Sequence, residues 1–169
     1  MKNLLFAFFA VALLASCGMD PAENPVYKEA MSSFNGLQDA YTAQETSMGE
    51  RAKELAGYTE SLKAMAEPDS AYAAAVNMFQ EVATKEGAAM NGFKEKIAGY
   101  KGLLAGFLTG ETKLDALKEM ATGMAADMTG MTNMSTEMGG MYTKIAGMIA
   151  SAKAAMETKG AEVMEEAKQ

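Results

Sequence analysis

The sequence of 169 residues contains no histidine and no tryptophan, and it has only one cysteine. The absence of His excludes Ser–His and Cys–His catalysis, imidazole ligation of metals and the commonest titrating group near neutral pH. A single Cys has no partner for an intramolecular disulfide. The formal net charge of −7 argues against a nucleic-acid partner, because such proteins normally carry a basic patch. There is also no Gly-rich phosphate loop, so we expect no enzyme.

The longest uncharged apolar run lies near the N-terminus and is short. It extends from Leu4 to Leu14 and follows a single basic residue, Lys2. A helix that spans a membrane needs about 20 apolar residues, and this run has eleven. One basic residue followed by a short apolar run is the layout of a secretory signal peptide.

The residues after this run, Leu14-Ala15-Ser16-Cys17, resemble the lipobox of bacterial lipoproteins. In that family the Cys thiol is lipidated, the chain is cut just before the Cys, and the new amino group is acylated. The resemblance implies a signal peptide over residues 1–16, a lipidated Cys17 and a tether over 17–24. It also implies attachment to a membrane of the cell envelope, with Gly18 favouring the outer over the inner membrane. The alternative is an ordinary signal peptide with a chance Cys.

The remaining chain is predicted to be all-α, because apolar residues recur at helical spacing and no stretch alternates like a strand. We expect helices over 25–66, 70–108 and 113–167. Asn24 before Pro25, and Asp69 or Ser70 after Pro68, are good helix starts, while Gly110 suits a helix end. Sustained spacing near 3.5 residues favours an elongated up-down-up bundle over 25–169 with coiled-coil-like heptad packing.

The second predicted helix has the most regular heptads. One apolar column contains Val76, Ala83, Met90, Ile97 and Leu104, and an aromatic column is broken only by an acid, Glu86. Gly92, Gly99 and Gly106 precede aromatic residues at the same spacing, and we expect them to admit a neighbouring helix closely. Asp127 also lies on an apolar face. Each acid is expected to pair with a Lys or to lie at the edge of the face, or alternatively to set helix register or partner choice.

Ten of the 17 methionines lie between residues 120 and 164, on one face of the third predicted helix. The first interpretation is a buried face, because Leu, Ile and Val share it. The second is a soft-metal site for Cu(I), since thioethers suit that ion and the stretch resembles Met-rich segments of periplasmic copper-resistance proteins. The third is an exposed surface for a partner helix or a lipid. The candidate copper set contains Met128, Met131, Met134, Met138 and Met141.

These observations favour a membrane-anchored bacterial lipoprotein that acts as a helical structural or interaction module in the cell envelope. Its partners would be the membrane, reached through the lipid on Cys17, and either another protein or copies of itself. No cofactor is expected beyond that lipid. The alternatives are a Met-rich Cu(I)-binding protein of the periplasm or cell surface, and a membrane-active protein that inserts its third helix.

Overall fold

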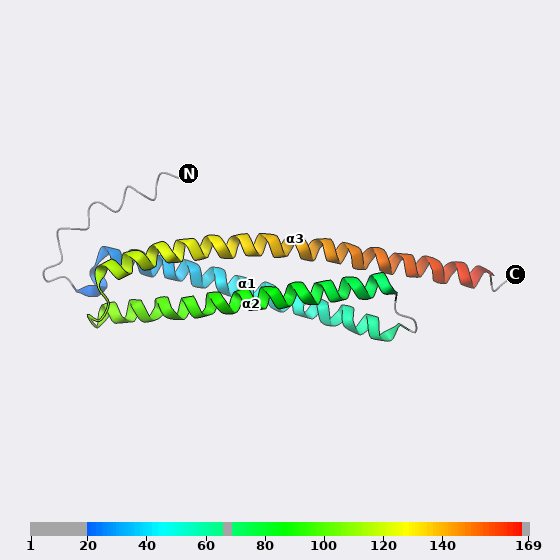
Figure 1. Ribbon diagram of the computed structural model, residues 1–169, viewed down its shortest axis with the longest axis horizontal. Coiled ribbons are helices and arrows are strands. Elements are labelled where there is room, and N and C mark those ends of the chain that lie inside the picture. Colours follow the sequence, from blue (N-terminus) through cyan, green and yellow to red (C-terminus); the bar gives the residue numbers. More distant parts are fainter. Residues whose placement is uncertain (1–19, 66–68, 167–169) are drawn as a thin grey trace, which may run out of the picture. The chain divides into compact units, whose positions relative to one another are not determined.

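The structure of the protein is a computed structural model that describes residues 20–65 and 69–166. Four elements follow one another: the 3-10 turn η1 (Pro21–Glu23) and the helices α1 (Pro25–Ala64), α2 (Ser70–Leu108) and α3 (Leu114–Glu166). Figure 1 shows α1 in blue to cyan, α2 in green and α3 in yellow to red. No strand occurs in the described ranges, which confirms the predicted all-α fold. Cys17 and the predicted cleavage site lie outside these ranges.

The predicted helix starts are made by side-chain caps. Asn24 Oδ1 accepts the backbone N–H of Val26 at 2.9 Å, directly before Pro25. Asp69 Oδ1 accepts the N–H groups of Ala71 and Tyr72 at 2.9 and 3.1 Å, so Asp69 rather than Ser70 caps α2. These bonds satisfy donors that have no partner inside the helix. Part of the predicted tether, residues 21–23, is the 3-10 turn η1.

The connection between α2 and α3 depends on two glycines. Gly110 has a φ of 80°, a conformation that side chains with a Cβ rarely adopt. The chain can therefore reverse there, and the N–H groups of Glu111 and Thr112 both reach the carbonyl of Gly106, at 2.8 and 3.0 Å. An ideal Cβ on Gly106 would lie 2.5 Å from Thr112 Oγ1. Gly106 is thus required by this turn, and α3 begins just after it.

Residue pairs in contact establish the direction of the helices. Gln44 meets Glu86, and the Tyr72 hydroxyl donates to the carbonyl of Tyr58. Residue numbers that rise on α1 therefore fall on α2, so these two helices are antiparallel. Tyr100 meets Asp127, and Phe93 lies against Gly130, which shows the same relation between α2 and α3. The up-down-up order predicted for the three-helix bundle is confirmed.

The contacts gather in two compact units, each containing a segment of all three helices. In the described chain the first unit comprises residues 20–41 and 92–131, and the second unit comprises 42–65, 69–91 and 132–166. The core of the first unit is built by Phe34, Leu37, Leu104, Leu117, Met120, Met124 and Met131. The core of the second unit is built by Tyr72, Ala75, Val76, Phe79, Val82, Tyr142, Ile145, Ile149 and Ala152.

The second unit also contains the end of the longest helix. Beyond Ala152 and the half-buried Met156, α3 is exposed at residues 157–158. Figure 1 shows its red end extending past the neighbouring ends of α1 and α2.

The predicted role of the glycine column on α2 is wrong. Gly92 and Gly99 are exposed, and an ideal Cβ on either would have nothing within 4 Å. Each glycine precedes its aromatic neighbour by one residue, which is about 100° of helix rotation. Because Phe93 and Tyr100 turn toward the core, the preceding glycines are rotated toward solvent. The close approaches between helices occur instead at Gly123 of α3, where an ideal Cβ would lie 2.8 Å from the Tyr100 hydroxyl oxygen, and at Gly36 of α1, where it would lie 3.3 Å from Met128 Cε.

Candidate functional site: two acid clusters and a methionine face

The second unit contains a carboxylate inside its core. Glu86 lies on the apolar face of α2 and is 1% exposed. It occupies the aromatic heptad column between Phe79 and Phe93, so the helix itself directs the carboxylate inward. A charge at this depth is strongly destabilising unless it is paired and hydrogen-bonded.

Three side chains from the other two helices satisfy this carboxylate. Gln44 of α1 donates from Nε2 to Glu86 Oε1 at 2.5 Å, and Arg51 of α1 forms an ion pair with the same oxygen. The Tyr142 hydroxyl of α3 donates to Oε2 at 2.8 Å. The Arg51 guanidinium also lies 4.6 Å from the centroid of the Tyr142 ring, in a cation–π contact. One carboxylate therefore links all three helices of the second unit.

The electrostatics of this Glu86 cluster (Gln44, Arg51, Glu86 and Tyr142) favour a neutral tyrosine. Burial raises the pKa of Tyr142, and its hydrogen bond to the charged Glu86 raises that pKa further, while Arg51 opposes the shift. The phenol therefore stays a hydrogen-bond donor at neutral pH. Both carboxylate oxygens of Glu86 accept hydrogen bonds from protein donors, so the cluster joins the three helices of the second unit.

The first unit contains a simpler acid cluster around Asp127 of α3. Its Oδ1 pairs with Lys96 Nζ, and its Oδ2 accepts the Tyr100 hydroxyl at 2.7 Å. Burial, the hydrogen bond to Asp127 and the charge of Asp127 raise the pKa of Tyr100 to about 12. Lys96 is 56% exposed, so this ion pair is solvated on one side and weaker than a buried one. Only α2 and α3 contribute to this Asp127 cluster.

Both acids form ion pairs, as the sequence predicted, but only one of them pairs with the predicted residue type. Asp127 pairs with a Lys, as expected, whereas Glu86 pairs with an Arg. Gln44 and Arg51 were missed as partners, although a sequence signal exists. They continue a heptad column of α1 that also contains Ala30, Leu37, Tyr58 and Met65, and its polar members lie in the middle. A polar pair inside an inward-facing column indicates a polar partner on the neighbouring helix.

The methionine face of α3 is mostly covered. Met120, Met124 and Met131 are buried, Met148 is exposed, and the other five with described side chains are half-buried: Met128, Met134, Met138, Met141 and Met156. In the candidate copper set, Met128 and Met131 belong to the first unit, and Met134, Met138 and Met141 belong to the second. Met138 and Met141 pack against the core of the second unit. This burial fits the buried-face interpretation.

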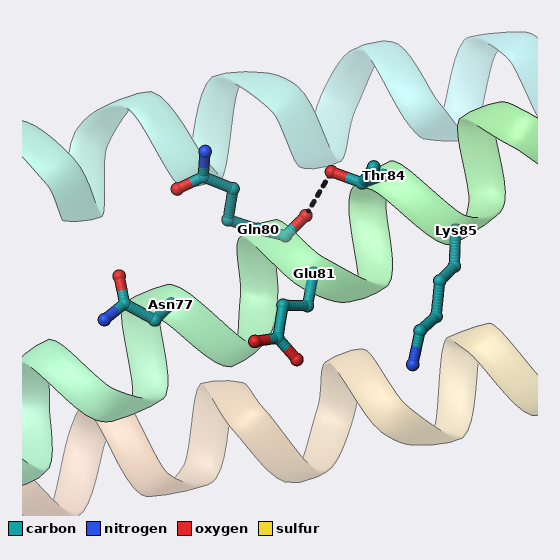
Figure 2. Close-up of a pocket in the computed structure, with 5 residues that line it drawn as sticks. All are labelled: Asn77, Gln80, Glu81, Thr84 and Lys85. Carbon is teal, nitrogen blue, oxygen red and sulfur yellow. Dashed lines mark hydrogen bonds between the residues drawn. The ribbon is translucent and has the colours of Figure 1, made fainter.

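The hollows on the surface are open, and both polar and apolar side chains line them. One hollow is lined by Asn77, Gln80, Glu81, Thr84 and Lys85, all from α2 (Figure 2). In Figure 2 the Thr84 hydroxyl donates to the Gln80 carbonyl of its own helix. A second hollow lies between α1 and α3 beside the Glu86 cluster, where Arg51 and Tyr142 meet Glu50 and Glu54. Neither hollow encloses a ligand-sized space away from solvent.

Within residues 20–65 and 69–166, no helix is long and apolar enough to cross a bilayer. The same part of the chain contains no group of three or more Cys, Asp or Glu side chains placed to hold a metal ion. No family model, no curated protein and no solved structure matches this chain.

Proposed function

We propose that this chain is a lipid-anchored helical interaction module of the bacterial cell envelope, attached to the membrane through Cys17. The observation that carries the proposal is the sequence Leu14-Ala15-Ser16-Cys17 placed directly after a short apolar run. Each buried CH₂ of an acyl chain contributes about 0.8 kcal/mol of membrane affinity. Two or three acyl chains on the first mature residue would thus hold the protein permanently at the membrane surface.

A module that binds through its surface, rather than an enzyme, is supported by the use of its polar groups. No buried side-chain nitrogen or oxygen in the described part of the chain lacks a hydrogen-bond partner. The carboxylates of Glu86 and Asp127 are both consumed by contacts between helices. Catalysis needs groups that are free to meet a substrate, and these acids are not.

The surface of α2 in the first unit supports a partner for the module. Leu103 is 38% exposed and lies one helical turn after Gly99, beside Gly102, so this side of α2 is smooth. Leu108, which is 45% exposed, lies at the end of α2 and about 140° further around the helix. Exposed leucines on a smooth helix are suited to packing against another helix. The partner would be another envelope protein or a second copy of this chain.

Metabolic labelling tests the anchor. The full chain, expressed in a bacterium that processes lipoproteins, is expected to incorporate labelled palmitate and to remain in the membrane fraction after an alkaline wash. Cys17→Ser should abolish both results, and Gly18→Ala should leave labelling intact. An unlabelled, uncut wild-type chain in the cytosolic fraction would refute the proposal.

Separation of the two membranes and crosslinking test the remaining parts of the proposal. We expect the labelled protein in the outer-membrane fraction, and its appearance in the inner membrane alone would overturn that placement. After gentle crosslinking of intact cells, we expect one discrete adduct that is lost in a Leu103→Lys, Leu108→Lys variant. An adduct that persists in this variant would show that the α2 surface is not the contact.

A further inference from the structure

The described part of the chain contains one kind of sulfur, the methionine thioether. The sequence has 17 Met, no His and no Trp, and its only thiol, on Cys17, lies outside the described residues. A thioether is oxidised to a sulfoxide, and sulfoxide reductases reverse this reaction. A thiol, by contrast, can proceed to sulfinic and sulfonic acids, which are essentially irreversible products. The sulfur chemistry of the described part of the chain is therefore the reversible oxidation of methionine to its sulfoxide.

The structure grades these sulfurs by their access to solvent. Met78 of α2 and Met148 of α3 are 41% and 38% exposed. Four others are almost fully covered: Met90, Met120, Met124 and Met131. Eight lie between these limits: Met31, Met48, Met65, Met128, Met134, Met138, Met141 and Met156. An oxidant dissolved in water would reach the two exposed methionines directly, whereas the four covered methionines are shielded by the fold.

The two exposed methionines belong to the second unit and differ in role from the buried ones. Met148 borders a surface hollow whose other walls include Ala71, Gly147 and Ser151. Met148 is 38% exposed beside these small side chains, and Met78 is 41% exposed on α2. A sulfoxide at either position would keep its new polar oxygen in water. At Met124, which is 0% exposed, the same oxygen would have to enter an apolar core.

We propose that the chain is a graded, reversible oxidant sink: among the methionines whose side chains the structure describes, Met78 and Met148 react first with oxygen-transferring oxidants and the buried ones are shielded. With hypochlorous acid, an S–O bond forms at the thioether and the O–Cl bond breaks. The sulfur loses two electrons, and the chlorine leaves as chloride while the proton passes to water. With hydrogen peroxide, the O–O bond breaks and water leaves. This activity is independent of the anchor at Cys17 and goes beyond the interaction module proposed above.

Peptide mapping by mass spectrometry tests the order of reaction. The purified full chain is treated with increasing hypochlorous acid, below one equivalent per methionine, and each sulfoxide is quantified. We expect the rate at Met78 and Met148 to exceed the rate at Met120 and Met124 by about tenfold or more, with unchanged helical circular dichroism. Sulfoxide reductases should then restore the original mass without unfolding. Equal rates at exposed and buried sites, helix loss during the first two equivalents, or sulfoxides that the reductases cannot reach would each overturn the proposal.

A competition experiment tests the sink itself. A short methionine-containing reporter peptide is mixed with the full chain before a limiting amount of oxidant is added. With one reporter methionine per chain, replacing Met78 and Met148 with Leu, which occupies a similar volume, should raise oxidation of the reporter by up to about threefold, because two of three comparably accessible sulfurs are lost. The matched variant Met120→Leu, Met131→Leu removes the same number of sulfurs from the core. It should leave reporter oxidation unchanged, and an equal effect from both variants would refute the grading.

Discussion

The Glu86 cluster permits a sharp prediction about the second unit, because its charge is buried and its partners are known. Arg51→Met keeps most of the aliphatic volume of the side chain but removes the cation from a carboxylate that is 1% exposed. Gln44 and Tyr142 would still donate to Glu86, but they cannot neutralise it. Removing one member of a buried ion pair costs about 3–5 kcal/mol. Since the Arg51 side chain is 18% exposed, we expect the lower end, about 3 kcal/mol.

The companion change, Glu86→Gln, should be milder. The amide retains an oxygen for Gln44 and Arg51 and a donor for the Tyr142 hydroxyl, and Arg51 can turn toward solvent. Loss of the charge on these hydrogen bonds should cost about 1–2 kcal/mol. The double variant removes both charges together, so it should cost about 1–2 kcal/mol rather than the sum of the single changes. The expected coupling energy is about 3 kcal/mol.

Urea denaturation followed by circular dichroism measures these differences. With a slope of about 2 kcal/mol per molar urea, Arg51→Met should lower the midpoint by about 1.5 M. Glu86→Gln in that background should recover about half of the shift. Lys53→Met, an exposed basic position on the same helix, is the control and should change stability by less than about 0.5 kcal/mol. Additive single changes, or an Arg51→Met effect as small as the control, would refute the reasoning.

Three further predictions concern the first unit and the methionine face. In an absorbance titration, Tyr100 should ionise near pH 12, because burial and Asp127 raise its pKa from 10.0 to about 12. The raised pKa means that the folded state favours the neutral phenol, so the stabilisation from Tyr100 is complete below pH 10 and is lost between pH 10 and 12. Tyr100→Phe should lower the amplitude of the late phase by one tyrosine while Tyr142, whose pKa is also raised, still titrates late; an unchanged amplitude would contradict the assignment. Gly99→Ala places a methyl group in open space and should raise the thermal midpoint, because Ala stabilises the helix by about 0.5–1 kcal/mol. Gly123→Ala should lower the midpoint, because its Cβ would lie 2.8 Å from the Tyr100 hydroxyl. Midpoint shifts of the same sign would be inconsistent with this packing. Finally, we expect equilibrium dialysis to show no stoichiometric Cu(I) on the candidate copper set, because its side chains are buried or half-buried. Retention of one Cu(I) per chain that is lost when the set is changed to Leu would assign the site to copper.

Local patterns were sufficient to predict where α1 and α2 begin and where α2 ends, whereas α1 ends at Ala64 rather than at the predicted residue 66. Asn24 and Asp69 cap α1 and α2, and Gly110 ends the helix before α3, because each acts on backbone groups only a few residues away. The inward-facing columns of α2 could also be predicted, because the helical repeat alone places Val76 and Phe79 on one face. The lipobox at Cys17 remains a prediction from sequence.

The sequence by itself therefore determined the helical elements, their apolar faces and the presence of two acids on those faces. Only the tertiary structure decided that Glu86 meets Gln44, Arg51 and Tyr142, and that Gly92 and Gly99 face solvent. The physical reason is that periodicity within one helix defines its own inward direction but not the rotation and axial shift of its neighbours. Those depend on how all three helices pack at once, and they decide which side chains meet.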